Sequence, residues 1–111
     1  MNLKFENKGE TMVCRIDGDV DINTSPSIKK LFDKALAKKA AKMVVNLQGV
    51  NYVDSSGLAT LVEILKNMRQ YGGKLKLSNL SPKIKSLFDI TKLDKLFEIA
   101  SDEEEAIASF I

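Results

Sequence analysis

Two strand-like segments near the start of the chain are joined by a very short loop. Residues 3–7 and 11–17 are both predicted to be β-strands. Only Asn7-Lys8-Gly9-Glu10 lies between them, which is too short for the helix that joins parallel strands. The two strands must therefore pair antiparallel, and this excludes a fully parallel, doubly wound sheet.

Helical and strand-like patterns alternate through the rest of the chain. Ser25-Pro26 and Ser81-Pro82 each look like a helix N-cap followed by proline at the first helical position. Ser101-Asp102-Glu103-Glu104 is typical of a capping box, and its acidic side chains suit the dipole of a last helix. The other predicted elements are strands at 42–47, 74–78 and 96–100, and a helix from about 56 to 70 that ends at Gly72-Gly73.

This order predicts an α/β fold built on a mixed sheet of four to five strands. The antiparallel N-terminal pair continues into strands joined by right-handed crossover helices. Residues 74–78 alternate Lys and Leu, as expected of a half-buried strand, so the helices are expected to pack mainly on one face. A chain of 111 residues with 44% hydrophobic content suits one domain, here residues 1–111.

The composition excludes most hydrolytic chemistry. The chain has no histidine, so it cannot form a Ser-His-Asp or Cys-His nucleophile. The single Cys14 allows no internal disulfide, which fits a reducing cytoplasm, and the usual zinc ligand sets are missing. A lysine nucleophile or a carboxylate Mg²⁺ site stays open. No apolar run is long enough to span a membrane.

The positive charge is carried mostly by lysine and favours no nucleic-acid partner. The formal net charge is +2, and a lysine cluster surrounds the first predicted helix, where aromatic residues for base stacking are lacking. We interpret this cluster as a solvated helix face. It comprises Lys29, Lys30, Lys34, Lys38, Lys39 and Lys42.

The segment Asp54-Ser55-Ser56-Gly57 lies between the strand at 42–47 and the following helix. The first N–H groups of a helix have no internal partner and the dipole is positive there, so a phosphate is stabilised. Ser55 is therefore a candidate phosphorylation site. The alternative is that Ser55 and Ser56 only cap the helix. Gly57 removes a side chain and would let another protein approach closely.

Acidic residues also follow the second predicted strand, in Gly18-Asp19-Val20-Asp21-Ile22-Asn23-Thr24. Asp19 and Asp21 are ordinary turn formers, and they could form an acidic pocket with Asp54. One alternative is a receiver-like protein that is phosphorylated on Asp54 and holds Mg²⁺ with Asp19 and Asp21. The antiparallel N-terminal pair argues against that fold.

With Asp54-Ser55-Ser56-Gly57-Leu58 in this frame, the chain resembles STAS domains of the anti-sigma-factor antagonist type, which act in bacterial partner switching. The resemblance extends over nearly the whole length. It includes the Gly18-Asp19-Val20-Asp21 turn, Val44-Val45-Asn46-Leu47, Gly72-Gly73-Lys74-Leu75 and the segment from Ser81-Pro82 to Leu87-Phe88.

The resemblance implies that Ser55 is phosphorylated by a serine/threonine kinase that is also the anti-sigma factor, and that a phosphatase resets it. It implies a cytoplasmic protein that is a substrate and not an enzyme, that needs no metal and no cofactor, and that has no nucleic-acid or membrane partner of its own. Two other functions stay open: partner switching without a sigma factor, and nucleotide or small-ligand binding. The expected partner-binding residues are Asp19, Asp21, Asn23, Thr24, Asp54, Ser56 and Gly57.

Overall fold

A mixed β-sheet forms the centre of the structure, a computed structural model that describes residues 1–110. The first two strands pair antiparallel, and every later pair is parallel. The strand order follows the chain, and the antiparallel pair predicted from the short loop is confirmed. The strands are β1 (Asn2–Lys8), β2 (Thr11–Asp17), β3 (Lys42–Gly49), β4 (Lys74–Ser78) and β5 (Glu98–Ala100).

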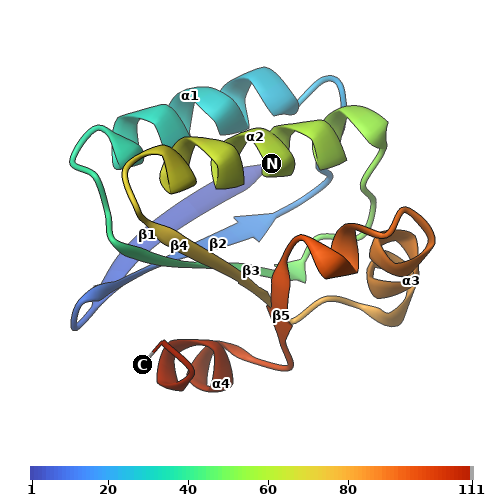
Figure 1. Cartoon of the computed structure of the whole chain (residues 1–111). Coiled ribbons are helices and arrows are strands. Elements are labelled where there is room, and N and C mark those ends of the chain that lie inside the picture. Colours follow the sequence, from blue (N-terminus) through green and yellow to red (C-terminus); the bar gives the residue numbers. More distant parts are fainter. Residues whose placement is uncertain (111) are drawn as a thin grey trace.

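Two long helices cover one face of this sheet, α1 (Ser25–Leu36) and α2 (Ser55–Gln70), as Figure 1 shows. Their apolar sides, with Phe32 and Leu61 fully buried, pack against sheet residues such as Val45. At the surface an ion pair between Lys29 and Glu63 (2.8 Å) joins the two helices. The main core of the protein lies between these two helices and the sheet.

The start of α1 differs from the sequence prediction by one residue. Thr24 occupies the N-cap position, and Ser25 is the first helical residue. The Ser25 hydroxyl is buried and has no hydrogen-bond partner within residues 1–110. The prediction that Ser25 caps the helix was therefore wrong. Thr24 takes part instead in the turn that precedes α1, described below.

Helix α3 (Pro82–Ile90) and the 3₁₀ turn η1 (Leu93–Lys95) follow β4. Here the predicted cap is confirmed, because the Ser81 hydroxyl accepts a hydrogen bond from the N–H of Ile84 (3.3 Å). Phe88 and Phe97 meet edge to face, with ring centroids 5.6 Å apart. These contacts attach α3 to the main core.

The opposite face of the sheet carries only the short helix α4 (Glu103–Ala108) among the described elements (Figure 1). The helices thus lie mainly on one face, as predicted. The prediction that β4 is half-buried was wrong, however, because α4 and the residues after it cover Lys76. Its Nζ donates to the Ser109 hydroxyl (2.5 Å), pairs with Glu98 (3.0 Å) and lies 4.6 Å from the Phe110 ring centroid.

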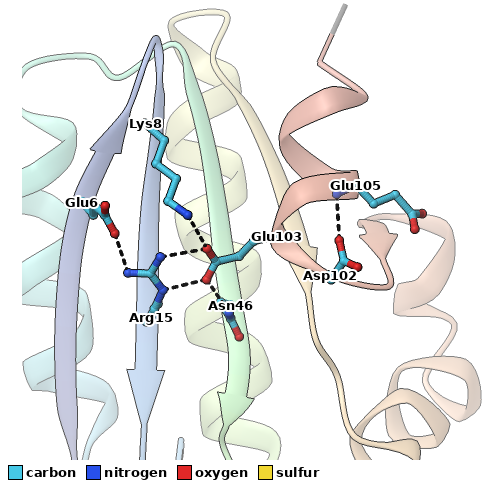
Figure 2. A network of polar contacts seen from close by, with 7 residues as sticks. All are labelled: Glu6, Lys8, Arg15, Asn46, Asp102, Glu103 and Glu105. Atoms are coloured by element: carbon cyan, nitrogen blue, oxygen red, sulfur yellow. Dashed lines mark hydrogen bonds and ion pairs between the residues drawn. The ribbon is translucent and has the colours of Figure 1, made fainter.

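A network of charges fixes the first turn of α4 to the sheet (Figure 2). The Glu103 carboxylate accepts two hydrogen bonds from Arg15 (2.7 and 2.8 Å), one from Lys8 (3.2 Å) and one from Asn46. The Arg15 hydrogen bonds lower the pKa of Glu103 to about 2, although burial opposes this change. The sequence assigned this acidic turn to the helix dipole alone and missed the long-range contacts.

The cap of α4 is also one residue later than predicted. Asp102, not Ser101, is the N-cap residue, and its carboxylate accepts a hydrogen bond from the N–H of Glu105 (2.8 Å; Figure 2). Serine and aspartate are both good N-cap residues, so the sequence alone allows the helix to begin after either Ser101 or Asp102. Because Glu103 must reach Arg15, the helix begins at Glu103.

Candidate functional site

Two loops meet at the carboxyl edge of the sheet, one after β2 and one after β3. The N–H of Gly18 donates to the carbonyl of Gly49 (2.9 Å), and that of Val20 donates to the carbonyl of Tyr52 (2.9 Å). Val20 and Val53 form an isolated parallel bridge. The carboxyl ends of adjacent parallel strands are where α/β proteins usually place their sites. We call residues 18–24 the β2–α1 loop.

Asp54 joins this loop to the start of α2. Its Oδ1 accepts a hydrogen bond from the N–H of Gly57 (2.8 Å), and its Oδ2 accepts one from the N–H of Ile22 (3.1 Å). The first contact makes Asp54 the N-cap of α2, with extended backbone angles. The interpretation that Ser55 or Ser56 caps the helix was therefore wrong, because the capping oxygen belongs to the preceding carboxylate.

Ser55 is the first residue of α2 and its side chain is exposed. Ser56 is partly buried, and its carbonyl accepts a hydrogen bond from the Thr60 hydroxyl (3.0 Å). Neither serine hydroxyl has a hydrogen-bond partner within residues 1–110. Since the cap does not need it, the Ser55 hydroxyl is available to a reagent from solvent.

Gly57 is buried against the β2–α1 loop. A Cβ at this position would lie 2.1 Å from the carbonyl oxygen of Val20, far inside contact distance. The sequence interpretation gave Gly57 the role of admitting another protein. That explanation was wrong, because the close approach is made by this chain's own backbone. Gly57 lets the β2–α1 loop lie directly on the first turn of α2.

The β2–α1 loop is ordered by a reciprocal pair of hydrogen bonds between Asp21 and Thr24. The Asp21 N–H donates to the Thr24 hydroxyl oxygen (3.0 Å), and the Asp21 carboxylate accepts from the Thr24 N–H (3.0 Å). The same carboxylate accepts from the N–H of Asn23 (2.9 Å), and the Thr24 hydroxyl donates to the Asp19 carbonyl (2.8 Å). Backbone donors thus engage the Asp21 carboxylate, and Asp19 contributes its carbonyl.

The carboxylates at this edge form no metal site. Within residues 1–110 no cluster of three or more His, Cys, Asp or Glu side chains could hold a metal ion. Asp19, Asp21 and Asp54 therefore do not form the Mg²⁺ site of the receiver-like alternative within these residues, and the antiparallel first pair of the sheet contradicts that alternative as well. The Cys14 thiol is no nucleophile either, because burial raises its pKa to about 12.

Two exposed apolar side chains lie on the segments around Asp54, and the sequence reasoning missed both. Ile22 is 67% exposed, and Tyr52 is 47% exposed. Both belong to the segments that hydrogen-bond around Asp54 and Val20. Their signal in the sequence is an apolar residue inside a polar turn. That signal is weak, because single exposed apolar residues are common on protein surfaces.

Comparison with known proteins identifies the family. Residues 2–106 match the sequence profile of the STAS domain. The chain belongs to the STAS domain family. Among its STAS relatives is the anti-sigma-B factor antagonist of Bacillus subtilis strain 168, which is 33% identical over 107 residues, 96% of this chain and 97% of the relative. The resemblance inferred from the sequence is thus confirmed.

Solved STAS structures share the same architecture. A Thermotoga maritima protein assigned as an anti-sigma factor antagonist aligns with a TM-score of 0.90 and 25% identity, covering 96% of this chain and 92% of that one. The Bacillus cell fate determinant SpoIIAA, in its phosphorylated form, aligns with a TM-score of 0.73 and 26% identity, covering 96% and 97%. The mixed sheet with an antiparallel first pair is therefore a STAS fold. No helix within residues 1–110 is long and apolar enough to cross a membrane.

Proposed function

We propose that this protein is an anti-sigma-factor antagonist whose partner is a serine/threonine kinase that also acts as the anti-sigma factor. The unphosphorylated protein docks on the kinase and displaces a sigma factor. Phosphorylation of Ser55 then ends the complex, and a phosphatase restores it. The protein is a substrate and a switch in the cytoplasm, and it catalyses no reaction itself. The relative in Bacillus subtilis carries the antagonist name, and the phosphorylated form of SpoIIAA supports the modification.

The exposed hydroxyl of Ser55 at the first position of α2 is the observation that carries this proposal. Asp54 already satisfies the N–H of Gly57, whereas the N–H groups of Ser55 and Ser56 have no partner within residues 1–110. A phosphate on Ser55 therefore finds backbone donors and the positive end of the helix dipole. The fold tolerates the modification, so its effect falls on the partner.

The charge of one phosphate is large enough to drive the exchange of partners. Phosphoserine adds about −1.5 to −2 charges at neutral pH. Reversing a two-partner equilibrium from 1:99 to 99:1 needs about 5.5 kcal/mol. Like charges brought together in an interface cost several kcal/mol. Repulsion at Ser55 thus supplies most of the required change without unfolding the protein.

The other predicted partner-binding residues contribute in two ways. Asp19, Asn23 and Ser56 lie at or near the surface around Ser55 and are proposed to contact the kinase. The buried Gly57 and the hydrogen-bonded Asp21, Thr24 and Asp54 shape that surface. The exposed Ile22 and Tyr52 side chains are proposed to add apolar contact area to that surface.

The test is a pull-down from a lysate of the native bacterium with the wild type, Ser55→Ala and Ser55→Asp as baits. We expect the wild type and Ser55→Ala to retain a serine-kinase-like protein, and Ser55→Asp to lose it. ATP should release that protein from the wild type but not from Ser55→Ala. Ser101→Asp is the charge-matched control, since Ser101 is exposed and follows β5, the last strand in the sheet order.

Equal retention by all baits would contradict the electrostatic switch. A retained kinase with no sigma factor released on docking would instead support partner switching of another kind. Saturable binding of a nucleotide to the isolated protein, with no kinase retained, would support the ligand-binding alternative.

A further inference from the structure

We propose that Asp54 is a positioning residue that links the phosphorylation state of Ser55 to the placement of Ile22. In the unmodified protein the Asp54 carboxylate holds the Ile22 backbone, and a phosphate on Ser55 breaks that contact. Ile22 is then no longer held out toward the partner. This inference rests on the proposed role of Ser55 as the phosphate acceptor.

Ile22 depends on Asp54 more than its neighbours in the β2–α1 loop do. Its N–H donates to Asp54 Oδ2 (3.1 Å), while its side chain is 67% exposed and has little packing to hold it. The N–H of Val20 is bonded to the carbonyl of Tyr52, and that of Asn23 to the Asp21 carboxylate. These neighbours therefore keep their contacts when the start of α2 changes, and Ile22 does not.

One carboxylate serves both the helix and the loop. Asp54 Oδ1 caps α2 through the N–H of Gly57 while Oδ2 binds Ile22, and both bonds can form together because Gly57 lies against Val20. The two oxygens are rigidly joined. Any rotation that removes Oδ1 from Gly57 therefore also moves Oδ2 away from Ile22.

A phosphate on Ser55 acts on this carboxylate in two ways. It places a second anion on the adjacent residue, and like charges at short range repel. It also competes with Asp54 for the N–H of Gly57, which is a donor at the helix start, where anions bind. The Asp54 carboxylate is thus displaced from the cap, and the Ile22 N–H loses its acceptor. The modified surface combines a new charge with a released apolar side chain.

The experiment compares the unmodified protein with protein that carries phosphoserine at position 55, introduced during synthesis so that no kinase is needed. Amide hydrogen exchange is followed residue by residue by NMR. We expect exchange at the Ile22 N–H to become faster by about tenfold, as loss of one charge-assisted hydrogen bond predicts. The Val20 N–H, bonded to Tyr52, should change by less than about twofold.

Phosphoserine at position 101 is the matched control. Ser101 is exposed and lies next to a capping aspartate, Asp102, but on the side away from the helix, so phosphoserine there adds the same charge without occupying the first helical position. It should leave the Ile22 N–H unchanged. If phosphoserine at 55 leaves Ile22 exchange unchanged, the inference is wrong. It is also wrong if Val20 is accelerated equally, because the whole loop then loosens.

Asp54→Asn tests whether the effect passes through this carboxylate. Asparagine keeps one oxygen to cap Gly57, but its amide nitrogen cannot accept from the Ile22 N–H. The unphosphorylated variant should already show fast Ile22 exchange, and phosphoserine at 55 should add little. An equal acceleration by phosphate in Asp54→Asn and in the wild type would overturn the inference.

This outcome is separable from that of the proposed function. If phosphoserine at 55 abolishes kinase retention while Ile22 exchange stays constant, the switch stands and the Asp54 link fails. If kinase retention survives the phosphate, the proposed function fails, whatever Ile22 does.

Discussion

At the scale of single residues, the start of α2 assigns two tasks to two adjacent side chains. The Asp54 carboxylate caps the helix through the N–H of Gly57, and the neighbouring Ser55 remains exposed. A hydroxyl that also capped the helix would be engaged by the backbone and less accessible to a kinase. With Asp54 as the cap, α2 has a stable N-terminus and the Ser55 hydroxyl stays exposed.

This division predicts opposite outcomes for two alanine variants. Ser55→Ala should change the free energy of unfolding by less than about 0.5 kcal/mol, because the hydroxyl makes no contact within residues 1–110. Asp54→Ala should lower it by about 1–2 kcal/mol, because the cap and the Ile22 contact are lost. Urea unfolding followed by circular dichroism measures both. If Ser55→Ala lowers the free energy of unfolding more than Asp54→Ala does, the serine and not the aspartate caps the helix.

Gly57→Ala should be among the most damaging small substitutions in the site. The added methyl group would lie 2.1 Å from the Val20 carbonyl oxygen, and backbone on both sides must shift to admit it. We expect a loss of about 2–3 kcal/mol in the free energy of unfolding. Ser56→Ala, one position earlier on the same turn, is the control and should cost far less. Equal urea midpoints for the two variants would contradict the close packing.

The sequence singled out Ser55 as the candidate acceptor, which stays a prediction, but it did not show how the surroundings of Ser55 are built. Ser55 stood out because Asp54-Ser55-Ser56-Gly57 occupies a strand-to-helix junction. Aspartate and serine are equally good caps, so the sequence could not choose the first residue of the helix. The first helical residue is set by the contact between Gly57 and Val20, which are far apart in the chain.

At the scale of elements, two sets of polar contacts hold α4 to the sheet. Charged side chains bind its first turn, and a lysine of β4 binds the residues that follow its last turn. Glu103 binds Arg15 and Lys8, while Lys76 reaches Ser109 and the Phe110 ring. The buried apolar cluster here has only three members, Ala106 with the sheet residues Val13 and Val44, and the partly buried Ala100, Ile107 and Phe110 pack against it. The polar contacts therefore carry an unusual share of the attachment of this helix.

Glu103→Gln should weaken this attachment in a pH-dependent manner. The pKa of Glu103 falls from 4.5 to about 2 on folding, so its stabilising effect is complete above pH 4.5 and is lost as the pH falls toward 2. At pH 7 we expect the variant to be less stable by about 1 kcal/mol, since Arg15 is partly exposed to solvent. Urea unfolding at several pH values measures the difference.

Glu104→Gln is the matched control for that experiment. Glu104 lies on the same turn of α4 but is exposed and outside the network of Figure 2. Its substitution should leave the free energy of unfolding nearly unchanged at pH 7. If the gap between the wild type and Glu103→Gln stays constant from pH 7 to pH 2, the charge network does not stabilise the fold.

The elements themselves were largely predictable, and α4 shows where prediction failed. The alternation of Lys and Leu in β4 correctly indicated a strand, but it could not show that another helix covers Lys76. The acidic first turn of α4 suits the helix dipole, which hid the role of Glu103. Its partner Arg15 is 88 residues away in the chain, and local patterns carry no information about such pairs.

At the scale of the whole molecule, the fold is expected to carry the switch without changing its own stability much. At the start of α2, the phosphate of phosphoserine 55 takes the place of the Asp54 carboxylate as the capping anion. It also interacts favourably with the helix dipole. We predict that the free energy of unfolding changes by less than about 1 kcal/mol, with an unchanged far-ultraviolet circular dichroism spectrum. Global destabilisation by several kcal/mol would show that the phosphate acts by unfolding the protein.

The topology followed from a few local features of the sequence. The loop between β1 and β2 dictated an antiparallel start, and the helices between later strands dictated parallel pairing. The meeting of the β2–α1 loop with Asp54 was not predictable in detail. It depends on β2 and β3 being neighbours in the sheet and on the hydrogen bonds that extend past their ends.

The joining of residues 18–24 to residues 54–57 has a consequence for the cell. A chain still emerging from the ribosome, or one that heat has unfolded, carries the same serine without the surface that surrounds it. Under the proposed function, a kinase that recognises this surface would respond only to the folded pool. Partial unfolding under thermal stress would then remove antagonist as the proposed phosphorylation does, so the output would depend on protein homeostasis as well as on ATP.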